Sequence, residues 1–331
     1  MHVYLHKISG KTMLNRRILR IKAFKVLYGS VLSENMSLAS AEAQLDASCE
    51  ATRDLYLYML SIVSPLTSVA RDRIEAAKAK FNPSEEELNP NTKFADNALA
   101  VFLDSDPDFQ KLLSKKKLSW QQYDLFLKKI MTSVASKQYY IDYMNSSDRS
   151  LAGDCKLFIK IFEEEFVDSQ DLERILEDMS IYWNDDLAYS LTWCCKTLKS
   201  IAKGERWALP ALYQSDMMKG EDIESDKLFV RRLLQSSFTN YEKYSTLIAE
   251  NVEGWEKERL FSTDVLLIVM GMAEAVTFPT IPLKVTMNEY VEISKFYGTP
   301  KSRSFVNGLL DRHIQAFVND GSIVKQGKGL L

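Results

Sequence analysis

Residues 263–318 decide the fold, and they read TDVLLIVMGMAEAV, TFPTI, PLKVTMNEYVEISKFYG and TPKSRSFVNGLLDRHIQAFV. Thr263 is a capping residue directly ahead of an apolar run. Pro282 fits the first turn of a second helix, and Gly298 suits a left-handed residue that ends it. Pro300, preceded by a threonine cap, fits the first position of a third helix. This punctuation predicts three helices joined by short loops, over 263–276, 282–298 and 299–318.

The composition extends this helical prediction to the whole chain. The chain has 331 residues, of which 46% are hydrophobic and 26% charged, as in an ordinary globular protein. Only 12 glycines and 8 prolines occur, and apolar residues recur at helical spacing almost everywhere. The predicted fold class is therefore all-α, with room for two domains or for one domain with a large insertion.

Charge is distributed unevenly along the chain. The formal net charge is −3, yet no Asp or Glu precedes Glu34. A basic N-terminal segment on an acidic body is a pattern that nucleic-acid-binding proteins often show. The basic residues of this segment are Lys7, Lys11, Arg16, Arg17, Arg20, Lys22 and Lys25.

The residue types that enzymes and metal sites require do not form a recognisable pattern. The four cysteines lack CxxC spacing and the three histidines are scattered, which favours reduced thiols and no metal site. The acidic runs at 85–87 and 163–165 are typical of solvated helix faces, and no glycine-rich phosphate loop is present. We expect a non-enzymatic protein without cofactor. The N-terminus lacks a signal-peptide core and no segment reaches membrane-span length, so we expect a cytoplasmic protein.

Punctuation along the chain predicts three segments. Residues 14–33 predict a helix with arginines in its first turns and apolar residues all round in its second half, which is typical of a central core helix. Pro65 predicts a kink or break, and NPSEEELNPN at 82–91 predicts a linker. The expected division is 1–81 (basic helix and first helical bundle), 82–182 (helical insertion of unknown role) and 183–331 (C-terminal bundle).

Two stretches resemble a known family. PLKVTMNEYVEISKFYGTPKSRSFVNGLLD at 282–311 closely resembles the C-terminal signature of the bacterial transcription antitermination factor NusB. The shared elements are a proline, Asn-Glu, a helix ending Phe-x-Gly, a polar turn and Phe-Val-Asn-Gly-x-Leu-Asp. NRRILRIKAFKVLYGSVLS at 15–33 resembles the opening helix of that family. The resemblance covers roughly 14–48 and 183–318, and it implies two small helical bundles of the NusB type with an additional helical insertion.

The resemblance also implies a function. A protein of this kind is a cytoplasmic, RNA-binding transcription antitermination factor that is not an enzyme. It is expected to act with NusE, a small-subunit ribosomal protein, on the single-stranded boxA RNA of ribosomal RNA operons. The partners it implies are therefore boxA-type RNA, NusE and the RNA polymerase antitermination complex, with no membrane.

Candidate site residues follow from the residue types and from the resemblance. The arginines of the helix predicted at 14–33 are expected to bind phosphates through their guanidinium groups. The turn TPKSRSF at 299–305 places two cations at the start of a helix, where backbone N–H groups also attract phosphate. The ring of Phe305, next to these cations, is expected either to stack on an unpaired base or to pack in the protein core. The predicted RNA-binding residues are Arg16, Arg17, Arg20, Lys301, Arg303 and Phe305. The residues implied for partner binding are Tyr28, Glu258 and Asp264.

Two departures from the family pattern keep a second function open. Val269 stands where the family usually has an arginine, and Lys301 stands where it often has an acidic residue. The missing arginine at 269, the acidic net charge and the inserted middle favour the alternative of a helical protein–protein adaptor that kept the scaffold without RNA binding. Lys301 instead strengthens the attraction of phosphate, and it puts in doubt a partner contact that used the acidic residue. A salt series on RNA binding separates the two functions.

Overall fold

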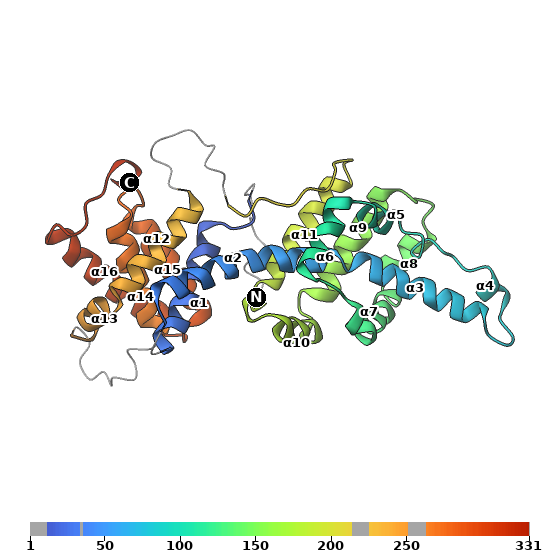
Figure 1. Cartoon of the computed structure of the whole chain (residues 1–331), viewed down its shortest axis with the longest axis horizontal. Helices are drawn as coiled ribbons and strands as arrows, with labels where there is room; N and C mark the ends of the chain where they lie inside the picture. Colours follow the sequence, from blue (N-terminus) through green and yellow to red (C-terminus); the bar gives the residue numbers. More distant parts are fainter. Residues whose placement is uncertain (1–11, 34–35, 214–224, 251–262, 331) are drawn as a thin grey trace. The chain divides into compact units, whose positions relative to one another are not determined.

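The structure is a computed structural model, and it describes residues 12–33, 36–213, 225–250 and 263–330. Every regular element within these ranges is helical, and none is a strand (Figure 1). This confirms the all-α prediction. None of the helices in the described ranges combines the length and the apolar character that crossing a membrane requires.

The helices form two compact units. The terminal unit consists of Gly10–Cys49 and Ala211–Leu331, and the middle unit contains Glu50–Pro210. These boundaries lie at other positions than the expected divisions after residues 81 and 182. The reason is packing: α2 (Leu38–Leu60) contributes residues to both units, and α11 (Leu187–Ile201) buries its apolar face within the middle unit.

The middle unit is built from short helices. α2 ends at Leu60 and α3 begins at Val63, so the expected break lies just before Pro65. The polar stretch 82–91 holds a single helical turn whose Ser84 and Glu87 form a capping box. The other elements are α3 (Val63–Lys78), α4 (Glu85–Leu88), α5 (Ala98–Asp104), α6 (Pro107–Lys116), η2 (Gln121–Tyr123), α7 (Asp124–Ala135), α8 (Gln138–Asn145), α9 (Leu151–Ile161), the π-helical turn η3 (Phe162–Phe166), α10 (Gln170–Met179) and η4 (Ile181–Trp183).

The terminal unit packs α1 against the C-terminal helices. Its elements are α1 (Arg16–Leu32), α12 (Asp226–Thr239), α13 (Tyr241–Glu250), α14 (Thr263–Thr277), α15 (Leu283–Tyr297), α16 (Ser302–Asn319) and η6 (Gly327–Leu330). Every residue from Val265 to Ala275 of α14 is buried, and α1 buries residues around most of its circumference. Both are therefore core helices. The prediction that the second half of α1 is its buried part was wrong, because the continuously buried stretch is Ile18–Phe24 and both Tyr28 and Leu32 are exposed.

Two details of the C-terminal punctuation were wrong. Gly298 has φ −111° and ψ −173°, so it is extended rather than left-handed. Glycine is needed there for space, because a Cβ would lie 2.4 Å from Ser302 Cβ and 2.7 Å from Ser294 O. The third helix begins at Ser302, later than the Thr299-Pro300 pair predicted, since these residues form the turn that Ser302 closes by accepting from Thr299 N at 2.7 Å.

His313 of α16 makes stability depend on pH. The side chain is buried, and its Nε2 has no hydrogen-bond partner among the described residues. Burial, aided by the charge of Arg312, lowers the pKa of His313 below its ordinary value near 6.5. Below pH ~6.5 the unfolded chain is protonated at His313 while the folded chain keeps the neutral form. The free energy of unfolding therefore decreases as the pH falls below ~6.5, and His313 does not lower it above that pH.

We expect His313→Gln to flatten this pH dependence. Between pH 7.5 and 5.5, the free energy of unfolding should fall more steeply in the parent protein, with a difference of at most about 1.4 kcal/mol per pH unit. Urea titrations of both proteins at the two pH values measure it. Equal losses in the two proteins would show that His313 is not the group responsible.

Candidate nucleic-acid interface

The first turn of α1 holds the predicted arginines in a fixed arrangement. Asn15 caps the helix, because its Oδ1 accepts from Arg17 N and Ile18 N, each at 3.0 Å. The first turn contains no acidic residue to balance the helix dipole. The cations are balanced instead by carboxylates from three other helices, α12, α14 and α15.

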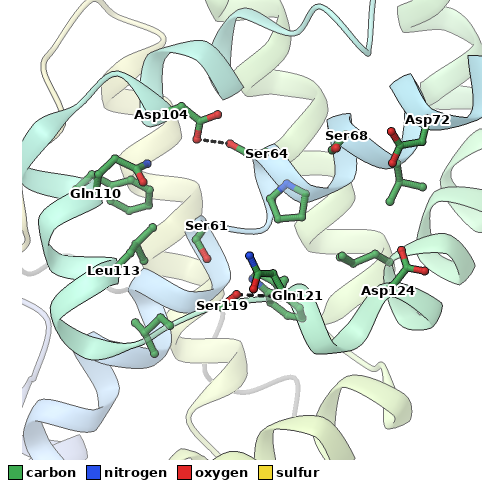
Figure 2. A pocket seen from close by; sticks show the side chains of 16 residues that line it. Ser61, Ser64, Ser68, Asp72, Asp104, Gln110, Leu113, Ser119, Gln121 and Asp124 are labelled. Carbon is green, nitrogen blue, oxygen red and sulfur yellow. Dashed lines mark hydrogen bonds between the residues drawn. The ribbon is translucent and has the colours of Figure 1, made fainter. Parts of the chain in front are cut away.

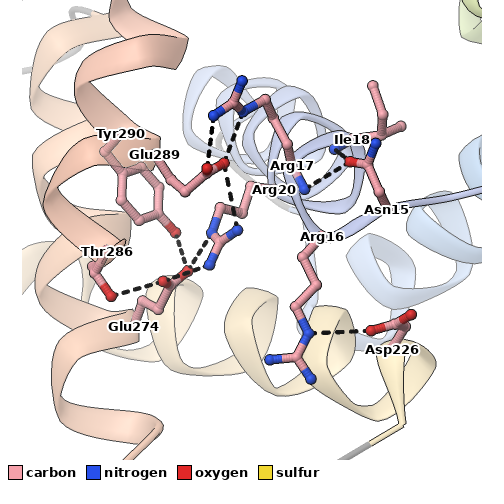
Figure 3. Close-up of polar contacts among 10 residues, drawn as sticks. All are labelled: Asn15, Arg16, Arg17, Ile18, Arg20, Asp226, Glu274, Thr286, Glu289 and Tyr290. Atoms are coloured by element: carbon pink, nitrogen blue, oxygen red, sulfur yellow. Dashed lines mark hydrogen bonds and ion pairs between the residues drawn. The ribbon is translucent and has the colours of Figure 1, made fainter. Parts of the chain in front are cut away.

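Arg20 is the centre of this arrangement and lies in the core (Figure 3). Its side chain is 3% exposed and that of Glu274 is 0% exposed. Nε and Nη2 of Arg20 donate to the two carboxylate oxygens of Glu274 at 2.7 and 2.8 Å, a bidentate pair. Burial opposes the charge of Arg20, but Glu274 more than offsets it and raises the arginine pKa.

The remaining lone pairs of the buried carboxylate are also used. Glu274 accepts from Thr286 Oγ1 at 2.8 Å and from Tyr290 Oη at 3.0 Å. Burial next to this carboxylate raises the pKa of Tyr290 well above its ordinary value, so Tyr290 stays a donor. Both oxygens of the buried carboxylate are thus hydrogen-bonded and faced by a cation, which is the condition under which a buried charge is tolerated in a core.

Arg17 and Arg16 lie nearer the surface and are also paired with acids. Arg17 donates to both oxygens of Glu289 at 2.8 and 2.7 Å, and Arg16 Nε donates to Asp226 at 3.1 Å (Figure 3). Burial would raise the pKa of Glu289, but its contacts with Arg17 and Arg20 lower it. The side chains of Arg16 and Arg17 are 35% and 41% exposed, so both still reach solvent.

These contacts correct one predicted RNA contact. Arg20 was expected to bind phosphate, but its guanidinium is buried and its fork is occupied by Glu274. Arg20 therefore holds α1 against α14 rather than facing a ligand. Arg16 and Arg17 remain candidates, although each already shares its charge with a carboxylate.

The start of α16 carries the other predicted cations: Lys301 directly precedes the helix, and Arg303 lies in its first turn. Ser302 is buried and donates to Asp264 Oδ2 at 2.7 Å, which fixes the start of α16 against the start of α14. Lys301 and Arg303, on either side of Ser302, are exposed, and neither forms an ion pair with any residue in the described ranges. Phe305 is half-buried, one turn further along. This turn is the least neutralised cationic position among the predicted sites.

The two groups of cations lie beside different parts of α1. Arg17 pairs with Glu289, and seven residues later Phe24 contacts Tyr297, their ring centroids 5.2 Å apart. Helices α1 and α15 therefore run side by side in the same direction. The turn that follows α15 lies beside the second half of α1, roughly 10 Å along the axis from the arginines. Arg16 and Arg17 therefore lie at the start of α1, and Lys301 and Arg303 lie beside its second half.

Two of the three residues expected to bind a partner, Tyr28 and Asp264, lie near that turn. Tyr28 is 37% exposed, and its ring centroid is 6.3 Å from that of Phe24. Asp264 is half-buried, and its Oδ1 accepts no hydrogen bond from a described residue. Burial raises the pKa of Asp264, opposed by the hydrogen bond from Ser302. Glu258 lies outside the described residues.

Sequence reasoning missed the acidic half of the network. Glu274 is the one charged residue between Val265 and Val276, and a lone carboxylate in a fully apolar helix requires a buried partner. That signal was present in the sequence. The identity of the partner was not, since Arg20 lies 254 residues away.

Comparison with known proteins agrees with the geometry of the terminal unit. A family model described as the NusB family matches residues 198–315. Residues 198–315 are a NusB-type domain. The match takes in α12 to α15 and most of α16, which supply the carboxylates around Arg20 and the cationic turn.

Individual relatives cover only part of this chain. A protein of Chloroherpeton thalassium named transcription antitermination protein NusB is 35% identical over 114 residues, which are 34% of this chain and 54% of that protein. Proteins of the same name from Salinibacter ruber and Syntrophotalea carbinolica are 29% and 39% identical over 41% and 25% of this chain, and over 85% and 54% of their own lengths. The chain thus spans about half the length of the first relative. No solved structure matches.

Proposed function

We propose that this protein is a transcription antitermination factor that binds boxA-type single-stranded RNA together with NusE. The observation that carries the proposal is the start of α16, within the NusB-type domain, where exposed Lys301 and Arg303 form no ion pair with any residue that the structure describes. Cations left unpaired beside a helix N-terminus favour an external anion such as phosphate. Phe305, half-buried next to them, is suited to stack on one base.

The other candidates take different parts in this proposal. Arg16 and Arg17 add phosphate contacts at the far end of α1 through the part of each guanidinium that reaches solvent. Arg20 contributes indirectly, because its pair with Glu274 fixes the helix that carries them. Tyr28 and Asp264 lie beside the cationic turn, where NusE would complete the RNA surface.

Lys301→Ala/Arg303→Ala is expected to weaken RNA binding and to make it less dependent on salt. Losing two phosphate contacts to a single strand should reduce the slope of log Kobs against log salt by about 1.4. Fluorescence anisotropy with a labelled boxA-type RNA, with and without NusE, measures this slope. Lys243→Ala/Lys328→Ala, which removes two exposed lysines elsewhere in the terminal unit, should leave the slope unchanged.

Two outcomes would contradict the proposal. If the parent protein binds NusE but shows no RNA binding even at low salt, the chain is the helical adaptor. If both double variants lower the slope equally, RNA is held by general charge and the turn is not its site.

A further inference from the structure

A hollow in the middle unit has no role in the RNA proposal. Its volume is about 370 Å³, and it opens between α3, α5, α6, α7 and the turn around Trp120 (Figure 2). All of its lining residues belong to the middle unit. The hollow is therefore formed within one compact body.

The base of the hollow is apolar and held in place by aromatic packing. Trp120 is buried, its Nε1 donates to Tyr58 O at 3.0 Å, and its ring stacks on that of Tyr58 with centroids 4.1 Å apart. Phe109, also buried, lines another part of the base. The remaining apolar lining residues are Pro65, Val69, Leu113, Leu118 and Leu127.

The rim of the hollow carries only negative charge. Asp72, Asp104 and Asp124 line it, and no lysine, arginine or histidine does. In Figure 2, Asp104 lies on one side of the opening and Asp72 and Asp124 lie on the other. Serine and glutamine side chains fill the rest of the rim: Ser61, Ser64, Ser68, Ser119, Gln110 and Gln121.

Two of these carboxylates have no cationic partner among the residues that the structure describes. Asp124 pairs with Lys128 at 2.6 Å on the exposed side of α7. Asp104 accepts a hydrogen bond from Ser64 Oγ at 2.7 Å, which orients the carboxylate without neutralising it. Neither Asp104 nor Asp72 forms an ion pair within the part of the chain that the structure describes.

We propose that this hollow binds a lysine- or arginine-containing segment of a partner protein. The aliphatic stem of one basic side chain packs on the base beside Leu113 and Leu127, and its charged end lies against the rim carboxylates. Carboxylates on two sides of the opening fit a peptide that carries more than one cation. The hydroxyl and amide groups of the rim supply acceptors for its backbone N–H groups.

The lining selects this ligand class over others. An anion would meet three carboxylates and no cation, and a purely apolar ligand would bury those carboxylates without a partner. An extended side chain that is apolar along its stem and positive at its end satisfies both the base and the rim. The proposal does not depend on RNA binding by the terminal unit, since it concerns other residues and another ligand.

The test is peptide binding by the full-length protein. The probe is a fluorescein-labelled peptide of alternating lysine and leucine, followed by anisotropy, with a peptide of alternating glutamate and leucine as its counterpart. We expect saturable binding of the basic peptide alone. Asp72→Asn/Asp104→Asn should weaken it about tenfold, the effect of removing two partly exposed charge contacts. Glu177→Gln/Asp178→Asn removes two exposed acids of α10 and is the matched control.

A third variant tests the position of the ligand. Ser68→Arg introduces a cation at the rim, where it should pair with the carboxylates and compete with the peptide. Absence of saturable binding, or equal weakening by the hollow and the control variants, would overturn the proposal. Displacement of the peptide by spermidine at equal charge concentration would overturn the choice of a protein segment and assign the hollow to a small polyamine.

Discussion

Arg20→Met is expected to destabilise the terminal unit by about 3–5 kcal/mol. The substitution keeps an unbranched apolar stem but removes the guanidinium that Glu274 contacts through both of its oxygens. A carboxylate that is 0% exposed then remains in the core without a compensating charge. The hydrogen bonds from Thr286 and Tyr290 remain, but hydroxyls do not replace a guanidinium.

Hydrogen exchange measures this loss where it occurs. Amides of α14 and α15 should exchange faster in Arg20→Met by the factor that corresponds to the lost free energy, and those of α9 in the middle unit should not.

Arg231→Met is the control, because the Arg231–Asp46 pair lies in the same unit with side chains 39% and 37% exposed, and such pairs contribute below about 1 kcal/mol. Arg20→Met/Glu274→Met should recover most of the loss, since it removes the unpaired charge. Equal destabilisation by Arg20→Met and Arg231→Met would contradict the assignment of Arg20 to the core.

Trp120→Ala is expected to destabilise the middle unit by about 3–5 kcal/mol. The side chain is 2% exposed, stacks on Tyr58 and on Phe126, and donates a buried hydrogen bond to Tyr58 O. The substitution removes this packing, opens a cavity and removes one of two donors to Tyr58 O, which keeps the hydrogen bond from Ser61 Oγ. Because Trp120 forms the base of the hollow, binding of the basic peptide should be lost as well.

The same exchange experiment distinguishes a local from a general effect. Amides of α3 and α7 should lose protection in Trp120→Ala, and those of α14 should keep it. Leu125→Ala on α7 is the control, because that side chain is 83% exposed and its truncation should change stability by less than about 0.5 kcal/mol. Protection of α3 and α7 that is unchanged in Trp120→Ala would show that the aromatic stack does not hold this unit together.

The sequence predicted most of the terminal unit because its signals are local. Apolar spacing, Pro282 and the Phe-x-Gly ending located α14 to α16 to within a few residues. The role of Gly298 was not predictable in this way. Its need for space arises from Ser302, whose position depends on the bond to Asp264 in another helix.

Charge in the candidate site was predictable only in part. The arginines within residues 16–20 predicted a cationic helix end. Glu274, within the apolar run of α14, implied a buried cationic partner. Which arginine is buried depends on the packing of α1 against α14. Nothing in the sequence of either helix indicates that the two pack together. The boundaries of the middle unit were not predictable for the same reason. Helix α11 has the composition of any core helix, so its sequence does not indicate to which unit it belongs.

The order of the segments along the chain constrains how this protein folds. Helix α1 contacts α12 through pairs such as Arg16–Asp226, 210 residues apart, so the terminal unit closes a very long loop. The middle unit shortens that loop when it folds, because Trp207 Nε1 donates to Tyr56 Oη at 3.1 Å near its two ends. On the ribosome, α1 and the first part of α2 emerge long before their partner helices exist. The middle unit is therefore expected to fold first, and the terminal unit to be completed after it.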